Sequence, residues 1–229
     1  MTQRKIQYWV IPPDANGEFV AKMENVLETY EKPYDSRFPV VCMDEQPIQL
    51  LEDINIPISA TKKHAKRVDY EYKRAGTASI FMFTEPLSQW RDVSVRERRT
   101  KIDWAIEVKR LLTGRYASAE KVILVCDNLN THTLGAFYEA FVASEAHDLA
   151  RRIELRYTPK HGSWLNIAEN ELSSMTRQCI QGRRFSTIEE LRTETNAWQN
   201  AINDRKRGVD WQFKLDDARI KLTSLYPKI

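Results

Sequence analysis

The sequence predicts an α/β fold in which a mixed β-sheet is flanked by helices. Two short apolar runs, VVCMDE at residues 40–45 and ILVCDN at residues 123–128, have the composition of strands that are buried on both faces of a sheet. Other segments repeat their apolar residues with the period of a helix. Strands come first in the chain and then alternate with helices, which is the order of an α/β sheet with an antiparallel edge.

The N-terminal part of the chain is expected to hold one helix and the first strands. Apolar residues recur at helical spacing between residues 17 and 31, and a core strand follows at residues 40–44. Residues 45–67 contain proline and mixed charge without a clear period, and we expect them to leave the sheet. An antiparallel hairpin is predicted next, because the runs at residues 77–83 and 90–95 flank a turn-forming segment.

From about residue 96 the pattern changes to helices that alternate with strands. A helix that ends near Gly114 precedes a strand at residues 121–126, and a further strand at residues 153–157 precedes a helix that begins near Leu165. Ser186 and the glutamate three positions later have the spacing of a capping box and predict the start of a last amphipathic helix. This order of elements is that of an RNase H-like domain.

Length and composition favour one main domain with two appendages. We expect an N-terminal linker segment with a short helix at residues 1–37, an RNase H-like domain at residues 38–207 and a C-terminal extension at residues 208–229. The formal net charge of +3 is too small to prove a nucleic-acid partner. Nothing resembles a signal peptide or a membrane span, so a cytoplasmic location is expected.

Two aspartates, Asp44 and Asp127, each stand at the end of an apolar run. An unpaired carboxylate is costly to bury, so each acid should lie at the exit of its strand, where solvent, a cation or a helix N-terminus can satisfy it. Each residue by itself is also compatible with a turn or capping role. The pair therefore indicates a metal site only in combination with a further acid.

Three blocks of sequence supply that combination. They are VVCMDEQ at residues 40–46, VILVCDNLNTH at residues 122–132 and YTPKHGSWLNIAENEL at residues 157–172. Together they resemble the DDE transposases, specifically the bacterial insertion-sequence branch of the mariner superfamily. The third block is the most specific, because Pro159 precedes a Leu-Asn-x-x-Glu helix start that ends in Glu169. The resemblance covers about residues 38–180 and implies a catalytic triad of Asp44, Asp127 and Glu169.

The identity of the third acid is open from sequence alone. The interval between Asp127 and Glu169 is longer than the compact spacing typical of the superfamily, which leaves Glu171 as a rival. Both glutamates flank the apolar stripe of the predicted helix, on opposite sides. Asn166 and Glu169 also have the spacing of a variant capping box, a structural role that would compete with metal binding.

The resemblance implies metal-dependent cleavage of transposon-end DNA and strand transfer into target DNA. Two Mg²⁺ or Mn²⁺ ions are expected, with Asp44 shared between them, Asp127 completing one site and Glu169 the other. The expected partner is double-stranded DNA, bound by a homodimer in the synaptic complex. Relatives begin with helix-turn-helix modules that read the transposon ends, and such a region is expected to be encoded separately. A bacterial protein of this kind would associate with the nucleoid.

The residues expected to contact DNA are basic or lie near the acids in the sequence. They are Lys62, Lys63, Lys66, Arg67, Asn128, His132, Lys160, His161, Trp164, Arg183 and Arg184. The alternative for the basic clusters is an ordinary solvated surface. His132 can instead orient the second acid or be a hydrogen-bonded structural histidine, and Trp164 can belong to the core.

Two other functions stay open at this point. One is a structure-selective DNA nuclease with the same RNase H-like fold, which would cut without joining ends to a target. The other is a DNA-binding or oligomerising fragment of a split transposase that has no catalytic activity.

Overall fold

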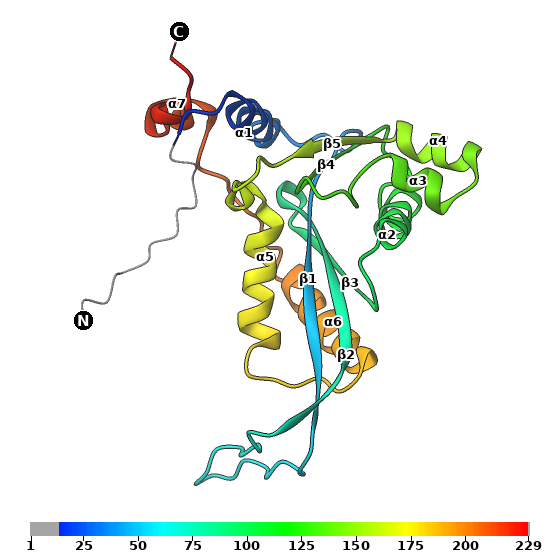
Figure 1. Cartoon of the computed structure of the whole chain (residues 1–229), viewed down its shortest axis with the longest axis vertical. Coiled ribbons are helices and arrows are strands. Elements are labelled where there is room, and N and C mark those ends of the chain that lie inside the picture. The colour runs from blue at the N-terminus through cyan, green and yellow to red at the C-terminus, as the bar shows by residue number, and fades with distance from the viewer. Residues whose placement is uncertain (1–13, 229) are drawn as a thin grey trace.

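A mixed β-sheet with helices on both faces forms the centre of the molecule (Figure 1). The computed structural model describes residues 14–228, so the first part of the expected linker segment lies outside the described residues. The strands are β1 (Val40–Asp53), β2 (Tyr72–Glu85), β3 (Trp90–Arg96), β4 (Val122–Cys126) and β5 (Ile153–Tyr157). Their order across the sheet is β3-β2-β1-β4-β5, with β1, β4 and β5 parallel and β2 and β3 antiparallel to their neighbours. The predicted mixed sheet is confirmed.

The helices form one layer on each face of this sheet. They are α1 (Gly17–Tyr30), α2 (Lys101–Thr113), α3 (Gly135–Ala140), α4 (Ala143–Arg151), α5 (Ile167–Met175), α6 (Ile188–Asp204) and α7 (Leu215–Lys221), and a π-helical turn, Thr176–Ile180, extends α5. One buried cluster joins α1, α5, α6 and α7 to the sheet, and a second joins α2, α3 and α4 to its other face. No helix within residues 14–228 is long and apolar enough to cross a membrane.

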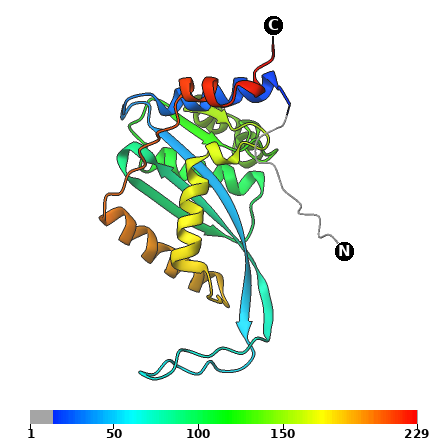
Figure 2. The same ribbon diagram turned by 90° about the vertical axis from the view of Figure 1, so that its left-hand side faces the viewer.

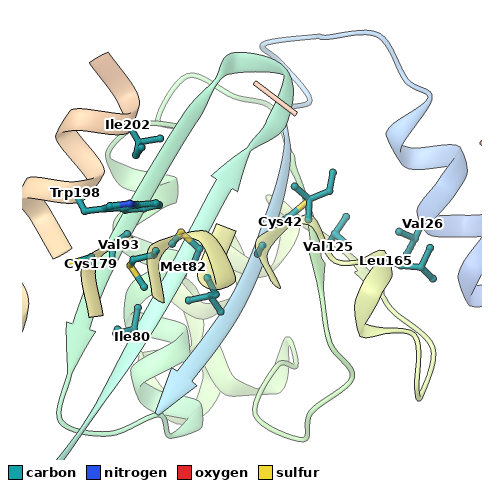
Figure 3. Close-up of a cluster of buried hydrophobic side chains, with 14 of the residues drawn as sticks. Val26, Cys42, Ile80, Met82, Val93, Val125, Leu165, Cys179, Trp198 and Ile202 are labelled. Carbon is teal, nitrogen blue, oxygen red and sulfur yellow. The ribbon is translucent and has the colours of Figure 1, made fainter. Parts of the chain in front are cut away.

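Alternation along β1 divides its side chains between the two layers. Cys42 belongs to the cluster under α5 and α6, which also contains Met82 and Trp198 (Figure 3). Val41 and Met43 belong to the cluster on the α2 side. Successive side chains of a strand point to opposite faces. The same alternation therefore places Asp44 toward α5 and Glu45 toward α2.

Strand β1 continues well past Asp44, and the expectation that residues 45–67 leave the sheet is wrong for their first part. Its pairing with β4 ends at Cys42, whereas its pairing with β2 extends to Asp53 opposite Tyr72. The apolar period of this ribbon is short, because Ile48 and Leu50 of β1 pack on the core while Tyr72–Thr77 of β2 are exposed. Only the hairpin loop (residues 54–71) leaves the ladder, and it projects away from the body of the molecule (Figure 2).

Most other boundaries agree with the sequence, and one cap is shifted by a residue. Helix α2 ends at Thr113 with Gly114 as its C-cap, as predicted, and β5 covers the predicted residues 153–157. Thr187, not Ser186, is the N-cap of α6, since its hydroxyl accepts a hydrogen bond from the amide of Glu190 at 3.1 Å. The Glu190 carboxylate accepts in turn from the Ser186 amide, at 2.9 Å. Adjacent Ser and Thr can both cap, so the sequence did not distinguish them.

The C-terminal segment packs beside the N-terminal helix (Figure 1). The amide of Asn16 donates to the carbonyl of Leu225 at 2.9 Å, and the Arg219 guanidinium lies 2.9 Å from the Glu24 carboxylate. Leu225 is buried, and Trp211 packs against the same cluster as α5 and α6. The extension therefore covers the core of this chain.

Candidate active site

Asp44 and Asp127 lie at one end of the β1–β4 pair. The last residues paired between these parallel strands are Cys42 and Val125, so Asp44 stands just past the point where β1 loses β4 as its neighbour. Asp127 directly follows the last residue of β4. Because parallel strands present their carboxyl ends at the same edge, both acids open toward the same side of the sheet.

Asn166 fixes the start of α5 over this edge. Its side-chain amide donates to the carbonyl of Met43 at 2.9 Å, and its oxygen accepts from the amide of Ala168 at 3.1 Å. The predicted N-cap role of Asn166 is thereby confirmed. The amide of Asn166 donates to Ser163 at 2.7 Å and does not bond Glu169. Among the described residues no hydrogen bond or ion pair uses the Glu169 carboxylate, which lies in the first turn of α5 and lines the same hollow as Asp44.

The charges of the other two acids affect the electrostatics of Asp44. Burial raises its pKa from 3.8 to about 7, and the negative charges of Asp127, Glu169 and Glu45 act in the same direction. A hydrogen bond from the amide of Glu45, 2.7 Å from Oδ1, opposes this rise. The site therefore concentrates negative charge, which a bound cation would relieve.

The rival glutamate, Glu171, is occupied elsewhere. Arg91 of β3 donates to both of its carboxylate oxygens, with Nε–Oε2 and Nη2–Oε1 distances of 2.8 Å. Both side chains are buried, at 4% and 10% exposure. A buried bidentate pair of this kind is costly to break. Glu171 consequently serves the packing of α5 on β3, and Glu169 is the helix acid available to the site.

His132 connects Asp127 to a second buried acid. Its Nδ1 lies 2.6 Å from Oδ1 of Asp127, and its Nε2 lies 3.1 Å from Oε1 of Glu45. Burial alone would lower the pKa of His132, but the interactions with Asp127, Cys126 and Glu45 outweigh it and raise the pKa to about 12. The imidazole is 1% exposed and stacks on Trp104. Surrounding side chains enclose the ring, which favours the alternative role of orienting the second acid, and the DNA contact of His132 stays a prediction.

Other predicted DNA contacts gather around an open hollow of about 890 Å³ beside Asp127. Asn128, Lys160 and His161 line it and are exposed. Lys160 and His161 occupy a tight turn in which the amide of Gly162 donates to the carbonyl of Pro159 at 2.9 Å. A Cβ at Gly162 would lie 2.5 Å from Cγ of Pro159, so this turn requires glycine. The turn directs the chain into α5.

A second hollow, of about 470 Å³, lies between β1 and α5 and contains Asp44 and Glu169. Gln46 and Arg177 extend its lining. Sequence reasoning missed Arg177, although it follows Glu169 by two helical turns and so shares its face. It also missed Glu45, which the alternation of β1 could have placed opposite Asp44.

The remaining predicted DNA contacts are dispersed. Lys62, Lys63, Lys66 and Arg67 are exposed on the hairpin loop. Arg183 pairs with Glu194 at 2.8 Å, and Arg184 pairs with Asp53 at 2.6 Å. Trp164 is half-buried and packs edge-on against Phe213, with ring centroids 5.7 Å apart. Arg183, Arg184 and Trp164 therefore already have partners within the protein.

The donor set fits Mg²⁺ or Mn²⁺, since carboxylate oxygens are the hard ligands that these ions prefer. Within residues 14–228, no three acidic, histidine or cysteine side chains converge on a single point as one ion would require. A site for two ions needs fewer protein ligands per ion, because each ion can take two carboxylates and complete its shell with water and phosphate oxygens. The negative charges of Asp127 and Glu169 both act on Asp44, since each raises its pKa.

Comparisons with known proteins agree with this geometry. Residues 39–192 match the family model described as DDE superfamily endonuclease. A comparison with curated proteins gave no match. The fold is similar to three solved structures: the Mos1 mariner paired-end complex with Mn (TM-score 0.53), the Mos1 strand transfer complex (0.56) and a pre-cleavage Mos1 transpososome (0.55). Identity to each is 14%, over 90% of this chain.

The family match and the structural similarity support different conclusions. At 14% identity the similarity to Mos1 is one of fold, and it confirms the predicted RNase H-like architecture. The chain spans 62% of the Mos1 chain in the Mn complex, so it corresponds to part of that protein. The family match covers more than half of the 229 residues. The chain therefore belongs to the DDE superfamily of endonucleases.

Proposed function

We propose that this chain is the catalytic part of a transposase of the mariner superfamily, which cleaves transposon-end DNA and joins the new 3′-hydroxyl to target DNA. The observation that carries the proposal is the placement of Asp44, Asp127 and Glu169 at one edge of an RNase H-like sheet, in a chain of the DDE endonuclease superfamily. The structures of similar fold are a paired-end complex and a strand transfer complex of Mos1.

The three acids have distinct proposed roles. Asp44 would be shared by two Mg²⁺ or Mn²⁺ ions, Asp127 would complete one site and Glu169 the other. Bound ions of this kind stabilise the attacking and the leaving oxygen of a phosphodiester. The protein contributes the fixed positions of the carboxylates, and the hydrogen bond from Asn166 to the carbonyl of Met43 ties the first turn of α5 to β1 next to Asp44.

DNA is proposed to run past both hollows at the acids. Asn128, Lys160 and His161 would hold phosphates beside Asp127, and Arg177 would do so beyond Glu169. The basic residues of the hairpin loop would reach DNA at a distance from the acids. Contacts from Arg183 and Arg184 would require a phosphate to share or replace their present carboxylate partners.

Two further partners are proposed. Ile56 is 93% exposed on the hairpin loop, and an exposed apolar side chain on a projecting element suits contact with a second copy of the chain in a synaptic complex. Phosphate contacts do not read sequence, so recognition of a transposon end would need base contacts from a helix-turn-helix region, encoded with this chain or separately. The reaction would take place on bacterial DNA, at the nucleoid. Analytical ultracentrifugation of the protein with and without end DNA tests whether it forms a dimer.

The catalytic proposal is tested by neutralising each acid. Asp44→Asn, Asp127→Asn and Glu169→Gln should each reduce Mg²⁺-dependent cleavage of end DNA by about a hundredfold or more, because each removes a ligand. Asp148→Asn, at an exposed acid of α4 on the opposite face of the sheet, is the matched control and should cut normally. Undiminished cutting by any of the three variants would remove that residue from the proposed site.

The structure-selective nuclease is the second candidate, because the family match names an endonuclease while joining rests on likeness of fold. Purified protein, a pre-cut transposon end and a target plasmid separate the two. Joined product supports the transposase, and cutting without joining supports the nuclease. DNA binding with no Mg²⁺-dependent cutting would instead indicate a non-catalytic fragment.

A further inference from the structure

A chain of three buried or partly buried side chains leads away from the proposed metal site. The Glu45 and His132 side chains are 2% and 1% exposed, and His132 lies between Glu45 and Asp127 with distances of 3.1 Å and 2.6 Å. Glu45 points into the α2 layer, on the opposite face of β1 from Asp44. Glu45 therefore cannot join Asp44 as a ligand of the same ion.

The buried position of Glu45 costs folding free energy, which suggests that the residue is kept for its function. Its second oxygen, Oε2, is buried and has no hydrogen-bond partner among the described residues. A buried carboxylate with an unsatisfied oxygen destabilises a fold, and its pairing with His132 offsets only part of that cost. An apolar residue would avoid this cost, since apolar side chains such as Met43 and Trp104 line this face of the sheet.

Asp127 is the residue that needs support. It follows β4 in a segment that has no regular structure until α3 begins at Gly135. Its Oδ1 is buried and has no hydrogen bond, and it lies 2.6 Å from Nδ1 of His132 as an ion-pair contact, while the side chain as a whole is 36% exposed. His132 is itself held from both sides, since its carbonyl accepts from the hydroxyl of Tyr157 at 2.6 Å and its ring stacks on Trp104.

We propose that Glu45 and His132 are positioning residues that fix the Asp127 carboxylate, with Oδ1 turned inward and Oδ2 left for metal. The inference deepens the proposed function and rests on Asp127 being a metal ligand. Glu45 holds the ring of His132, and the ring holds the carboxylate at the orientation that the metal requires. Partners of this kind, one bond removed from a metal ligand, commonly affect metal affinity by about 10–100-fold.

The test is direct binding of Mn²⁺ to the full chain, measured by electron paramagnetic resonance without DNA. Glu45→Gln and His132→Gln should weaken Mn²⁺ binding by about 10–100-fold. Glu85→Gln is the matched control, because Glu85 is likewise a buried, charge-paired glutamate, with Tyr116 and Arg115 as its partners. It should lower the thermal midpoint of the metal-free protein and leave Mn²⁺ affinity unchanged.

The dependence of the cleavage rate on Mn²⁺ concentration supplies the second readout. In Glu45→Gln, the Mn²⁺ concentration for half-maximal cleavage should rise while the rate at saturating Mn²⁺ recovers most of the wild-type value. A purely structural role would lower activity in proportion to the unfolded fraction, with no change in metal dependence. If His132→Gln does not fold, Glu45→Gln still decides the question, because the substitution keeps size and hydrogen-bonding capacity.

Asp127→Asn separates failure of the inference from failure of the proposed function. If Asp127→Asn loses Mn²⁺ and Glu45→Gln binds it normally, the positioning role is overturned and the metal site stands. If Asp127→Asn binds Mn²⁺ as tightly as the wild type, Asp127 is not a ligand, and the inference falls together with that part of the proposed site. Loss of Mn²⁺ affinity in Glu85→Gln equal to that in Glu45→Gln would also overturn the positioning role.

Discussion

At the scale of single residues, Asp44 is a carboxyl whose ionised form is disfavoured in the folded protein. Burial is the largest effect on its carboxyl, and three neighbouring negative charges add to it. The fold nevertheless keeps the residue at this position, tied through the carbonyl of Met43 to the cap of α5. A site that is costly in the free protein and relieved by a cation is the expected state of a metal-binding carboxylate cluster.

The pH dependence of stability follows from this effect. The folded-state pKa of Asp44 is about 7, above the ordinary value of 3.8, so ionisation disfavours the folded state. The cost is absent below about pH 4 and complete above about pH 7. Asp44→Asn should therefore stabilise the metal-free protein by on the order of 3 kcal/mol at about pH 8 and have little effect at about pH 4. Urea denaturation in EDTA at both pH values measures this, and a destabilised variant at the higher pH would contradict it.

The two glutamates of α5 should behave oppositely. Glu171→Ala leaves the buried Arg91 guanidinium without its carboxylate partner, and should destabilise the fold by about 3–5 kcal/mol. Glu169→Gln removes a charge from the acidic cluster and should leave stability unchanged or slightly raised. Thermal denaturation of both metal-free variants compares them. Equal destabilisation would mean that Glu169 also has a structural partner.

Sequence could propose the acids of the candidate site but not choose between these glutamates. Asp44, Asp127 and Glu169 stand in blocks with recognisable neighbours. The choice between Glu169 and Glu171 depends on Arg91, which is 80 positions from Glu171 and meets it only in the folded chain. Helical phase places the two on different sides of the stripe and says nothing of what each side faces.

At the scale of elements, α6 protects the open edge of the sheet. Every second residue of β3 points its backbone amide and carbonyl away from β2, and side chains of α6 bond these groups. Asn203 accepts from the amide of Arg91 at 2.9 Å and donates to its carbonyl at 2.8 Å. Gln199 accepts from the amide of Val93 at 2.6 Å, and Arg192 donates to the carbonyl of Val95 at 3.0 Å. An exposed edge strand otherwise invites pairing with another chain.

Removing one of these contacts should weaken the edge. Asn203→Ala leaves the amide and carbonyl of the buried Arg91 without partners, and should cost about 2 kcal/mol. Asn200→Ala, at an exposed position of the same helix, is the matched control and should change stability by less than about 0.5 kcal/mol. Urea denaturation gives both values. Equal effects would show that the contribution of Asn203 is one of helix propensity alone.

Elements with an apolar face were predictable, and the long β1–β2 ribbon was not. Helix α1 and strand β5 each bury one side and therefore carry a period in sequence. From Gln46 onward β1 alternates between exposed and partly buried residues with only Leu50 buried, and its partner over Tyr72–Thr77 is exposed. Such strands are held by backbone pairing, which leaves little trace in residue type.

At the scale of the whole molecule, the hairpin loop is the part that stands clear of the packed layers (Figure 1). Its base is tied to the body through Arg184, which bonds the Asp53 carboxylate at 2.6 Å and the carbonyls of Asp69 and Glu71 at 2.7 and 3.1 Å. The loop itself carries four exposed cations, Lys62, Lys63, Lys66 and Arg67. Its contribution to folding and its contribution to binding should therefore be separable.

Replacing residues 54–71 by an Asn-Gly turn separates them. Asp53 and Tyr72 are already paired, and a two-residue turn of this sequence closes an antiparallel hairpin without disturbing its register. The variant should unfold cooperatively near the wild-type midpoint, because neither buried cluster includes the loop. Its affinity for double-stranded DNA should fall, and the slope of log affinity against log salt should decrease by about 0.9 for each cation that contacted a phosphate.

A loop without its four cations is the matched control for that experiment. Substituting alanine for Lys62, Lys63, Lys66 and Arg67 keeps the loop and removes only its cations. If these residues hold phosphates, both variants should show the same loss of salt-dependent affinity in fluorescence anisotropy. If only the deletion loses affinity, the exposed apolar residues such as Ile56 make the contact, which would place the loop at an interface with a second copy of the chain. Unchanged DNA affinity and salt slope in both variants would exclude the hairpin loop from the DNA surface and confine the proposed contacts to the hollows beside Asp127 and Glu169.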